Sequence, residues 1–246
     1  IRHTTLALGL LLVVFMLSSC KSSGSKTSVN IPKNVPAKYV ANVQSALNEA
    51  GDNAPELLKV LTTLKGEELD GASFLISTMP FPDLISIKAD YLLEHLHYAY
   101  LIKHKYPWMK DMPEDTFLAY VLPYRMAEEP ITAHRKYFYE QLDPLVRDCE
   151  TMLEAAYQVN LWLGGERKDT QAGYAKQRVR FEPSEARDKS PFATLLGGQG
   201  RCEEMMIIFM AATRAVGIPS RSVYTPYWPK CDNNHAWTEI WANPVR

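Results

Sequence analysis

The chain has 246 residues, enough for one large domain or two small ones, and 46% of them are hydrophobic, as in ordinary globular proteins. Lysine and arginine number 27 against 28 aspartates and glutamates, which gives a formal net charge of −1. This balance excludes the basic surface by which proteins bind nucleic acid or an acidic membrane. The glycine-rich stretch "GGQGR" lacks both the Walker lysine and the Rossmann spacing, so no nucleotide site is expected.

The first residues have the layout of a secretory signal. A short basic start at Arg2 and His3 precedes an apolar run over residues 6–17, which is too short to span a bilayer as a stable helix. Small residues then lead to Cys20, and "LSSC" resembles the lipobox of bacterial lipoproteins, in which the cysteine is lipidated. A plain signal peptide with a chance cysteine is the alternative. We expect a signal peptide at residues 1–19.

The polar stretch after Cys20 indicates a flexible tether at residues 20–36. The resemblance to lipoproteins implies a protein anchored by lipid in the cell envelope, and the lysine after Cys20 favours the outer membrane. If Cys20 carries lipid, three cysteines remain, Cys149, Cys202 and Cys231. An odd number leaves at least one thiol free in an oxidising compartment, and a disulfide between two of them stays open.

Residues 37–163 predict a largely helical region. A helical pattern from Val40 breaks at Gly51, and Pro55 suits the first turn of the next helix. The segment "DGASFLISTMPFPDL", with two prolines close together, predicts a loop. Beyond it, apolar residues recur with helical spacing at Leu92, Leu93, Leu96 and Tyr100.

Asp111, three residues before Glu114, predicts a helix cap with Pro113 in the first turn, and Pro123 should end or kink that helix. Residues 134–165 predict one long helix or two, interrupted near Pro144 and stopped by two glycines. The aromatic residues of this region predict core packing: Tyr98, Tyr100, Trp108, Phe138 and Tyr157. The region has no helical HExxH pattern and no clustered carboxylates, so a metal site is not expected there.

From residue 164 the sequence changes character. A polar, irregular stretch predicts a loop or a short extended segment, and Glu203–Val216 predicts a helix that stops at Gly217. "SRSVYTPYW" and "HAWTEIWA" predict two strands joined by a turn at "CDNN".

Cys202 lies at the predicted start of this helix, after a glycine-rich turn. Unpaired backbone N–H groups and the helix dipole favour a thiolate at that place, and the same N–H groups can face an oxyanion. Glu203 and Glu204 work against a thiolate, and Arg201 offsets part of their charge. A cysteine nucleophile needs a base, and His235 is the candidate, sharing a strand face with Trp237, Glu239 and Trp241. A buried thiol, a hydrogen-bonded strand histidine, or a zinc site using Cys202, Cys231 and His235 remain alternatives.

The ordered trio "GRCEEMM", "RAVGIPSR" and "NHAWTEIW" resembles the motif blocks of the transglutaminase-like superfamily, over about residues 191–241. The resemblance implies an α+β fold in which the helix that carries the cysteine packs on antiparallel strands, with Cys202 as nucleophile and His235 as base. It implies packing roles for Ala211, Ala212, Arg214 and Ala215. Gln199 lies near where an oxyanion donor would be, without an assigned role.

The third residue of that superfamily, usually an aspartate on the next strand, has no clear counterpart. Asp232 is too close to His235 in the chain, Glu239 is about 13 Å along the same strand, and Asn243 is a poor candidate beside Pro244. We therefore expect residues 164–246 to be a transglutaminase-like core that is incomplete at its C-terminus.

The expected function is thiol-dependent acyl transfer at amide bonds in the cell envelope, on a peptide, protein or peptidoglycan-stem substrate. Hydrolysis is favoured over transamidation, and no cofactor, metal or calcium loop is expected. The alternative is a surface-anchored binding or scaffold protein without catalytic activity.

Overall fold

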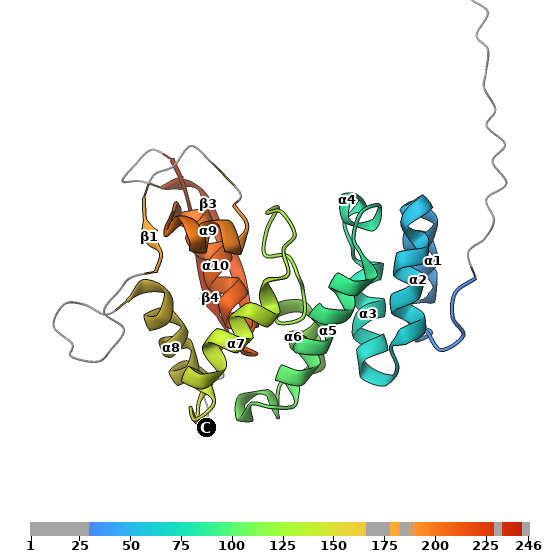
Figure 1. The fold of residues 1–246 in the computed structure, drawn as a ribbon, viewed down its shortest axis with the longest axis horizontal. Helices are drawn as coiled ribbons and strands as arrows, with labels where there is room; N and C mark the ends of the chain where they lie inside the picture. The colour runs from blue at the N-terminus through green and yellow to red at the C-terminus, as the bar shows by residue number, and fades with distance from the viewer. Residues whose placement is uncertain (1–29, 166–177, 183–186, 188, 229–232, 243–246) are drawn as a thin grey trace, which may run out of the picture.

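The computed structural model describes residues 30–165, 178–182, 187, 189–228 and 233–242. Its helices follow one another from α1 at one end of the molecule to α7 and α8 near the other, where α9, α10 and the hairpin of β3 and β4 gather (Figure 1). The chain is therefore α+β, as predicted. No helix within the described ranges is long and apolar enough to cross a membrane. The predicted signal, the tether up to residue 29 and Cys20 lie outside these ranges.

The first part of the chain is helical. Its elements are α1 (Val40–Ala50), η1 (Gly51–Asn53), α2 (Ala54–Thr63), α3 (Gly66–Ser77), α4 (Phe81–Leu84), α5 (Ala89–Lys103), η2 (Pro107–Met109) and α6 (Glu114–Tyr120). The expected break follows α1, where Gly51 has a φ of 55°, and Pro55 lies in the first turn of α2. The predicted stripe of α5 turns inward, with Leu92, Leu96 and Tyr100 buried.

The loop expected over residues 70–84 is wrong in large part. Residues 70–77 belong to α3, and the two prolines lie beyond that helix, at the N-cap of α4 and in its first turn, where proline is tolerated. Gly71 allows α3 to approach α5, because a Cβ at this position would clash with the hydroxyl of Tyr100. A contact between two helices thus stabilises a segment whose local composition indicates a loop.

The capping arrangement expected at Asp111 is also wrong. The helix α6 begins at Glu114 with Pro113 at its N-cap and no side-chain cap, and it ends at Tyr120, before Pro123. Two helices follow, α7 (His134–Val146) and α8 (Met152–Gly164), and Pro144 stays inside α7. The break comes instead before Thr151, whose hydroxyl accepts from the backbone of Glu154 in a capping box that starts α8.

Most of the aromatic residues expected in the core are at least partly buried, including Tyr100 and Phe138 at 2% and 0% exposure. Tyr157 is the exception, with 60% of its surface exposed. The opposite side of α8 supplies the core contacts, through Ala156, Val159 and Trp162.

The C-terminal elements are β1 (Arg180–Phe181), α9 (Pro191–Gly197), β2 (Gln199–Gly200), α10 (Cys202–Arg214), β3 (Ser220–Trp228) and β4 (Asn233–Ile240). The predicted helix and both predicted strands are present, and Gly217 has the positive φ, 74°, of a helix stop. The short helix α9 was not expected; the Ser190 hydroxyl caps it by accepting from Ala193 N over 3.2 Å. Asn233 and Asn234 begin β4 and do not belong to the turn, while Cys231 and Asp232 lie outside the described residues.

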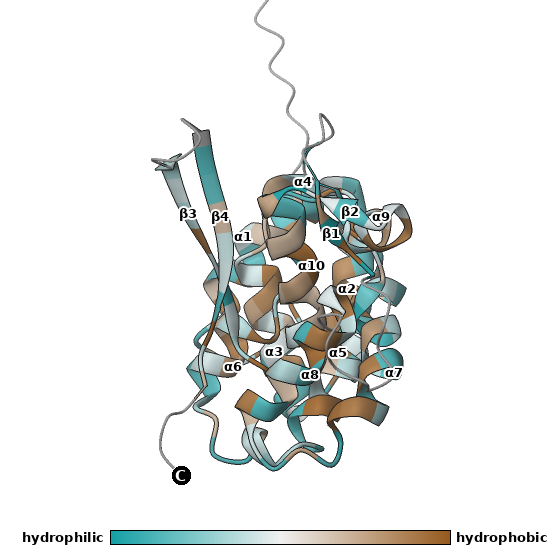
Figure 2. Cartoon of the chain, turned by 90° about the vertical axis from the view of Figure 1, so that its left-hand side faces the viewer, coloured by the Kyte–Doolittle hydropathy of each residue, from teal (hydrophilic) through white to brown (hydrophobic). Residues whose placement is uncertain are grey.

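The strands β3 and β4 pair antiparallel, with Ser220 opposite Ile240 and Thr225 opposite His235. Beyond Thr225 the register becomes irregular. The hairpin stands along one side of the molecule and packs on α10 (Figure 2). This packing decides which of its residues can meet the cysteine helix.

Candidate active site

Cys202 is the first residue of α10, with Arg201 at the N-cap. Its thiol is half-buried and free, and Cys149 is likewise a half-buried free thiol. The sequence prediction of a cysteine at a helix start is therefore confirmed. Cys202 is the residue that places a nucleophilic atom beside the backbone N–H groups of the first turn.

Glu204 and Gly200 build this helix start. Glu204 is fully buried, and its Oε2 accepts a hydrogen bond from Arg201 N over 2.8 Å. A Cβ at Gly200 would lie only 2.6 Å from the Cβ of Glu204. Because only glycine leaves room for this buried carboxylate, the "Gly-x-Cys" pattern has a steric reason in this chain.

The inner face of β4 lies along α10. Thr238 Oγ1 donates to Met206 O over 3.2 Å, and Ala236 is only 3% exposed. Asn234 Nδ2 donates to Glu203 Oε1 over 2.9 Å, which ties the start of β4 to the first turn of the cysteine helix. The sequence predicted only that the charge of Glu203 opposes a thiolate; it did not predict the bond between Glu203 and Asn234, each the chain neighbour of a predicted site residue.

His235 lies on the other face of the hairpin. Successive side chains of a strand alternate, so His235 points away from the face that carries Ala236 and Thr238. Its ring centroid is 4.7 Å from that of Trp228 and 5.8 Å from that of Trp237. Among the described residues no hydrogen bond joins Cys202 to His235. The structure brings the chain segments of the two residues to the same end of α10 but leaves their reactive atoms on different faces of β4.

The other residues considered for this site have partners of their own. Glu239 forms an ion pair with Arg221 over 2.8 Å, directly across the hairpin, so its carboxylate does not orient His235. Gln199 lies in β2 and accepts from Arg180 Nη2 over 3.4 Å. Asp232 and Asn243 lie outside the described ranges.

The residues expected to support α10 are buried. Ala211, Ala212 and Ala215 are at most 1% exposed, and Arg214 is 6% exposed. The Arg214 guanidinium donates from Nη1 to Arg125 O over 2.9 Å and from Nη2 to Ser220 O over 2.8 Å. It therefore joins the end of α10 to the start of β3 and to the loop after α6.

No group of three or more potential metal ligands lies together within the described ranges. The zinc alternative named in the sequence includes Cys231, which is not among these residues. Cys202 and His235, the two described residues of that alternative, face different sides of β4 and so do not form a shared metal site in the described geometry.

Comparison with known proteins agrees with the motif trio. The family model of the Transglutaminase-like superfamily matches residues 141–246, which include Cys202, α10 and the hairpin. No curated protein and no solved structure matches the chain. The C-terminal part of this α+β chain is a transglutaminase-like superfamily domain.

Proposed function

We propose that this domain carries out thiol-dependent acyl transfer at amide bonds, with Cys202 as nucleophile and His235 as base. The observation that carries the proposal is the free Cys202 thiol at the first position of α10, within the residues that match the superfamily. The bond between Glu203 and Asn234 supports it, because it holds the strand of His235 at the same helix end.

The proposed reaction begins when the Cys202 thiolate attacks the carbonyl carbon of an amide. Backbone N–H groups of the first turn of α10 stabilise the oxyanion. The C–N bond breaks as protonated His235 gives its proton to the leaving amine, which leaves a thioester on Cys202. Water then attacks the thioester, and His235 takes a proton from that water. The C–S bond breaks, which releases the carboxylic acid and regenerates the Cys202 thiolate. An amine in place of water would give transamidation; hydrolysis is favoured because water is always present.

The position of His235 sets a condition on this chemistry. General base catalysis requires hydrogen-bond reach between the base and the group that loses its proton. His235 must therefore leave its contact with Trp228 and Trp237 and approach Cys202 from the other side of β4. An aromatic pair stabilises a structure by on the order of 1 kcal/mol, so breaking the contacts of His235 with these tryptophans costs little. The larger requirement is a movement of the start of β4.

The same observation favours a second candidate function. A domain whose histidine faces away from its cysteine can act as a surface-anchored binding or scaffold protein without catalysis. Thiol reactivity separates the two candidates, because only a paired thiolate reacts fast near neutral pH.

The experiment follows alkylation by iodoacetamide at each cysteine by peptide mass spectrometry between pH 6 and 9. The catalytic proposal expects Cys202 to react fastest near neutral pH and His235→Gln to slow that reaction. Cys149→Ser is the matched control, because it removes another half-buried free thiol and should leave the fast reaction unchanged. Equal, slow alkylation of all the cysteines would reject the catalytic proposal and favour the scaffold.

We also propose that the protein works in the cell envelope, held by a lipid on Cys20, with the outer membrane as its site. Its substrate would be a peptide, a protein or a peptidoglycan stem. The support is the "LSSC" sequence after an apolar run and before a polar stretch. Incorporation of radiolabelled palmitate in bacterial cells tests the anchor: Cys20→Ser should abolish it, and incorporation that survives this substitution would contradict it.

A further inference from the structure

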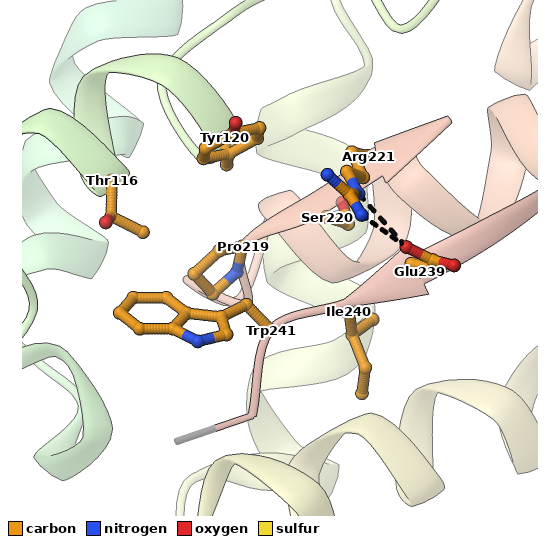
Figure 3. Close-up of a pocket in the computed structure, with 8 residues that line it drawn as sticks. All are labelled: Thr116, Tyr120, Pro219, Ser220, Arg221, Glu239, Ile240 and Trp241. Carbon is orange, nitrogen blue, oxygen red and sulfur yellow. Dashed lines mark hydrogen bonds and ion pairs between the residues drawn. The ribbon is translucent and has the colours of Figure 1, made fainter. Parts of the chain in front are cut away.

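A second site lies at the base of the hairpin, where β3 begins and β4 ends. A pocket of about 400 Å³ opens between this base and α6, within the range typical of small-molecule sites (Figure 3). It is built near the C-terminal end of α10, since Ser220 in its wall bonds to Thr213 Oγ1 over 3.0 Å. Cys202 is at the opposite end of that helix, on the order of 18 Å away at the usual rise per residue.

The walls of the pocket are aromatic and apolar. Trp241 and Tyr120 contribute their rings from opposite sides, with Pro219 between them (Figure 3). Both residues remain partly open to solvent, since Trp241 is 45% and Tyr120 is 40% exposed. Flat aromatic rings that stay exposed in a concave site are suited to stacking against an apolar ligand face.

One edge of the pocket carries an ion pair with spare hydrogen-bonding capacity. Arg221 donates from Nε and Nη2 to the same oxygen of Glu239, over 3.0 and 2.8 Å. Within the described chain, Arg221 Nη1 and Glu239 Oε1 have no hydrogen-bond partner, and they lie at the two opposite ends of the ion pair (Figure 3), so each end of the pair keeps a group that can bond to a ligand. Hydroxyl groups of a ligand match these two ends, because one hydroxyl can accept from the guanidinium while another donates to the carboxylate.

The hydroxyls of Thr116 and Tyr120 add further polar positions on the α6 side. Neither hydroxyl makes a hydrogen bond to another group in the described part of the chain. The pocket therefore combines flat apolar walls with polar groups at its edge. A pyranose ring has the same division, with C–H groups on its faces and hydroxyls around its rim.

We propose that this pocket binds a pyranose ring of a carbohydrate, independently of any chemistry at Cys202. The aromatic rings stack on the sugar face, and Arg221 and Glu239 each hold a hydroxyl of its rim. A phosphate or other anion fits less well, because Glu239 neutralises the arginine. An aromatic amino-acid side chain would use the walls and leave the spare donor and acceptor unused.

The test is a titration of the ¹⁵N-labelled protein with methyl β-glucopyranoside and N-acetylglucosamine, with phenylalaninamide as the aromatic comparison. The indole N–H signal of Trp241 should shift saturably with a sugar. Trp241→Ala should weaken binding at least ten-fold, equivalent to about 1.4 kcal/mol, and Glu239→Gln should weaken it several-fold. Trp237→Ala is the matched control, because Trp237 lies on β4 four residues before Trp241, is 37% exposed and does not line the pocket; binding should stay within about two-fold.

Cys202→Ser should bind sugar as the unchanged protein does, which keeps this test separate from the acyl-transfer proposal. Saturable binding of phenylalaninamide with no response to either sugar would overturn the proposal in favour of a site for an aromatic side chain. Equal losses in Trp237→Ala and Trp241→Ala would assign the binding to exposed tryptophans in general. No saturable shift with any probe would remove the site altogether.

Discussion

Arg135 on α7 donates from Nη1 to the main-chain oxygen of Arg214, the last residue of α10, over 2.9 Å. Both guanidinium groups are buried, and both also donate to main-chain oxygens of the loop that follows α6. Arg135 Nη2 donates to Val121 O over 2.6 Å, and Arg214 Nη1 donates to Arg125 O over 2.9 Å. The end of the cysteine helix is thus held by the same polar network as the loop after α6. The helical region and the C-terminal elements share one buried interior there.

The first prediction concerns this network. Arg214→Lys should lower the free energy of unfolding by about 2–3 kcal/mol, because a lysine cannot reach the oxygens of both Arg125 and Ser220 and leaves one buried carbonyl unsatisfied. Urea unfolding measures the change. Arg221→Lys, on the surface, is the matched control and should leave the unfolding midpoint nearly unchanged. Equal midpoints for the two variants would mean that the buried network contributes little.

Elements with local signals could be predicted from the sequence. The break after α1 comes at Gly51, α10 stops before Gly217, and the period-two alternation of β4 is visible in the sequence. The helix α3 could not be predicted, because its Gly71 is explained only by Tyr100 on another helix. Where a contact between distant segments stabilises an element, local composition indicates the wrong structure.

The candidate site also has features that the sequence predicts and features that depend on tertiary packing. Alternation along β4 placed His235 on one face with Trp237, and the structure agrees. Which face meets α10 depends on tertiary packing, and Ala236 and Thr238 occupy that position. The sequence motif therefore located both predicted residues near one helix end without revealing that their side chains lie on different sides of the strand.

The second prediction is a loss of stability in acid caused by two buried histidines. His95 donates from Nε2 to Leu122 O over 2.7 Å and accepts from Arg135 Nε over 3.4 Å at Nδ1, so it is neutral in the folded state. Burial, followed by the charge of Arg135, lowers the pKa of His95 well below its usual value and that of His134 to about 3. The unfolded chain then binds these protons first as the pH falls below about 6.5.

Each histidine should therefore cost up to about 1.4 kcal/mol of unfolding free energy per pH unit below about pH 6.5, and for His134 this window extends down towards pH 3. Urea unfolding between pH 7 and 5 measures the slope. His134→Asn keeps a donor for Thr132 O and removes the titrating ring, so its slope should be smaller by about one proton. The same variant at pH 8, where no proton is taken up, is the control for its effect on packing. If the slope of His134→Asn equals that of the unchanged protein, His134 is not one of the groups that cause the loss of stability in acid.

The third prediction concerns Cys149. Burial raises the pKa of the Cys149 thiol, and the charges of Glu154 and Asp148 add to the effect. Its alkylation by iodoacetamide should therefore be slow at pH 7 and should rise steadily with pH, because the thiolate is the reactive form. Glu154→Gln should speed the reaction modestly by removing one of these charges. If Cys149 reacts fast at pH 7, and at the same rate in the Glu154→Gln variant, the prediction of a raised thiol pKa is wrong.

The fourth prediction tests the steric reason for the "Gly-x-Cys" pattern. Gly200→Ala places a Cβ 2.6 Å from that of Glu204, so the buried glutamate must shift and lose its bond to Arg201 N. Overpacking of this kind costs about 1–3 kcal/mol, and it disturbs the first turn that presents Cys202. Thermal unfolding and alkylation of Cys202 should therefore both change. Gly197→Ala is the matched control three residues earlier, where a Cβ meets nothing within 4 Å, and it should leave both measurements unchanged. If the two alanine variants behave alike, the helix start does not depend on the close contact between Gly200 and Glu204.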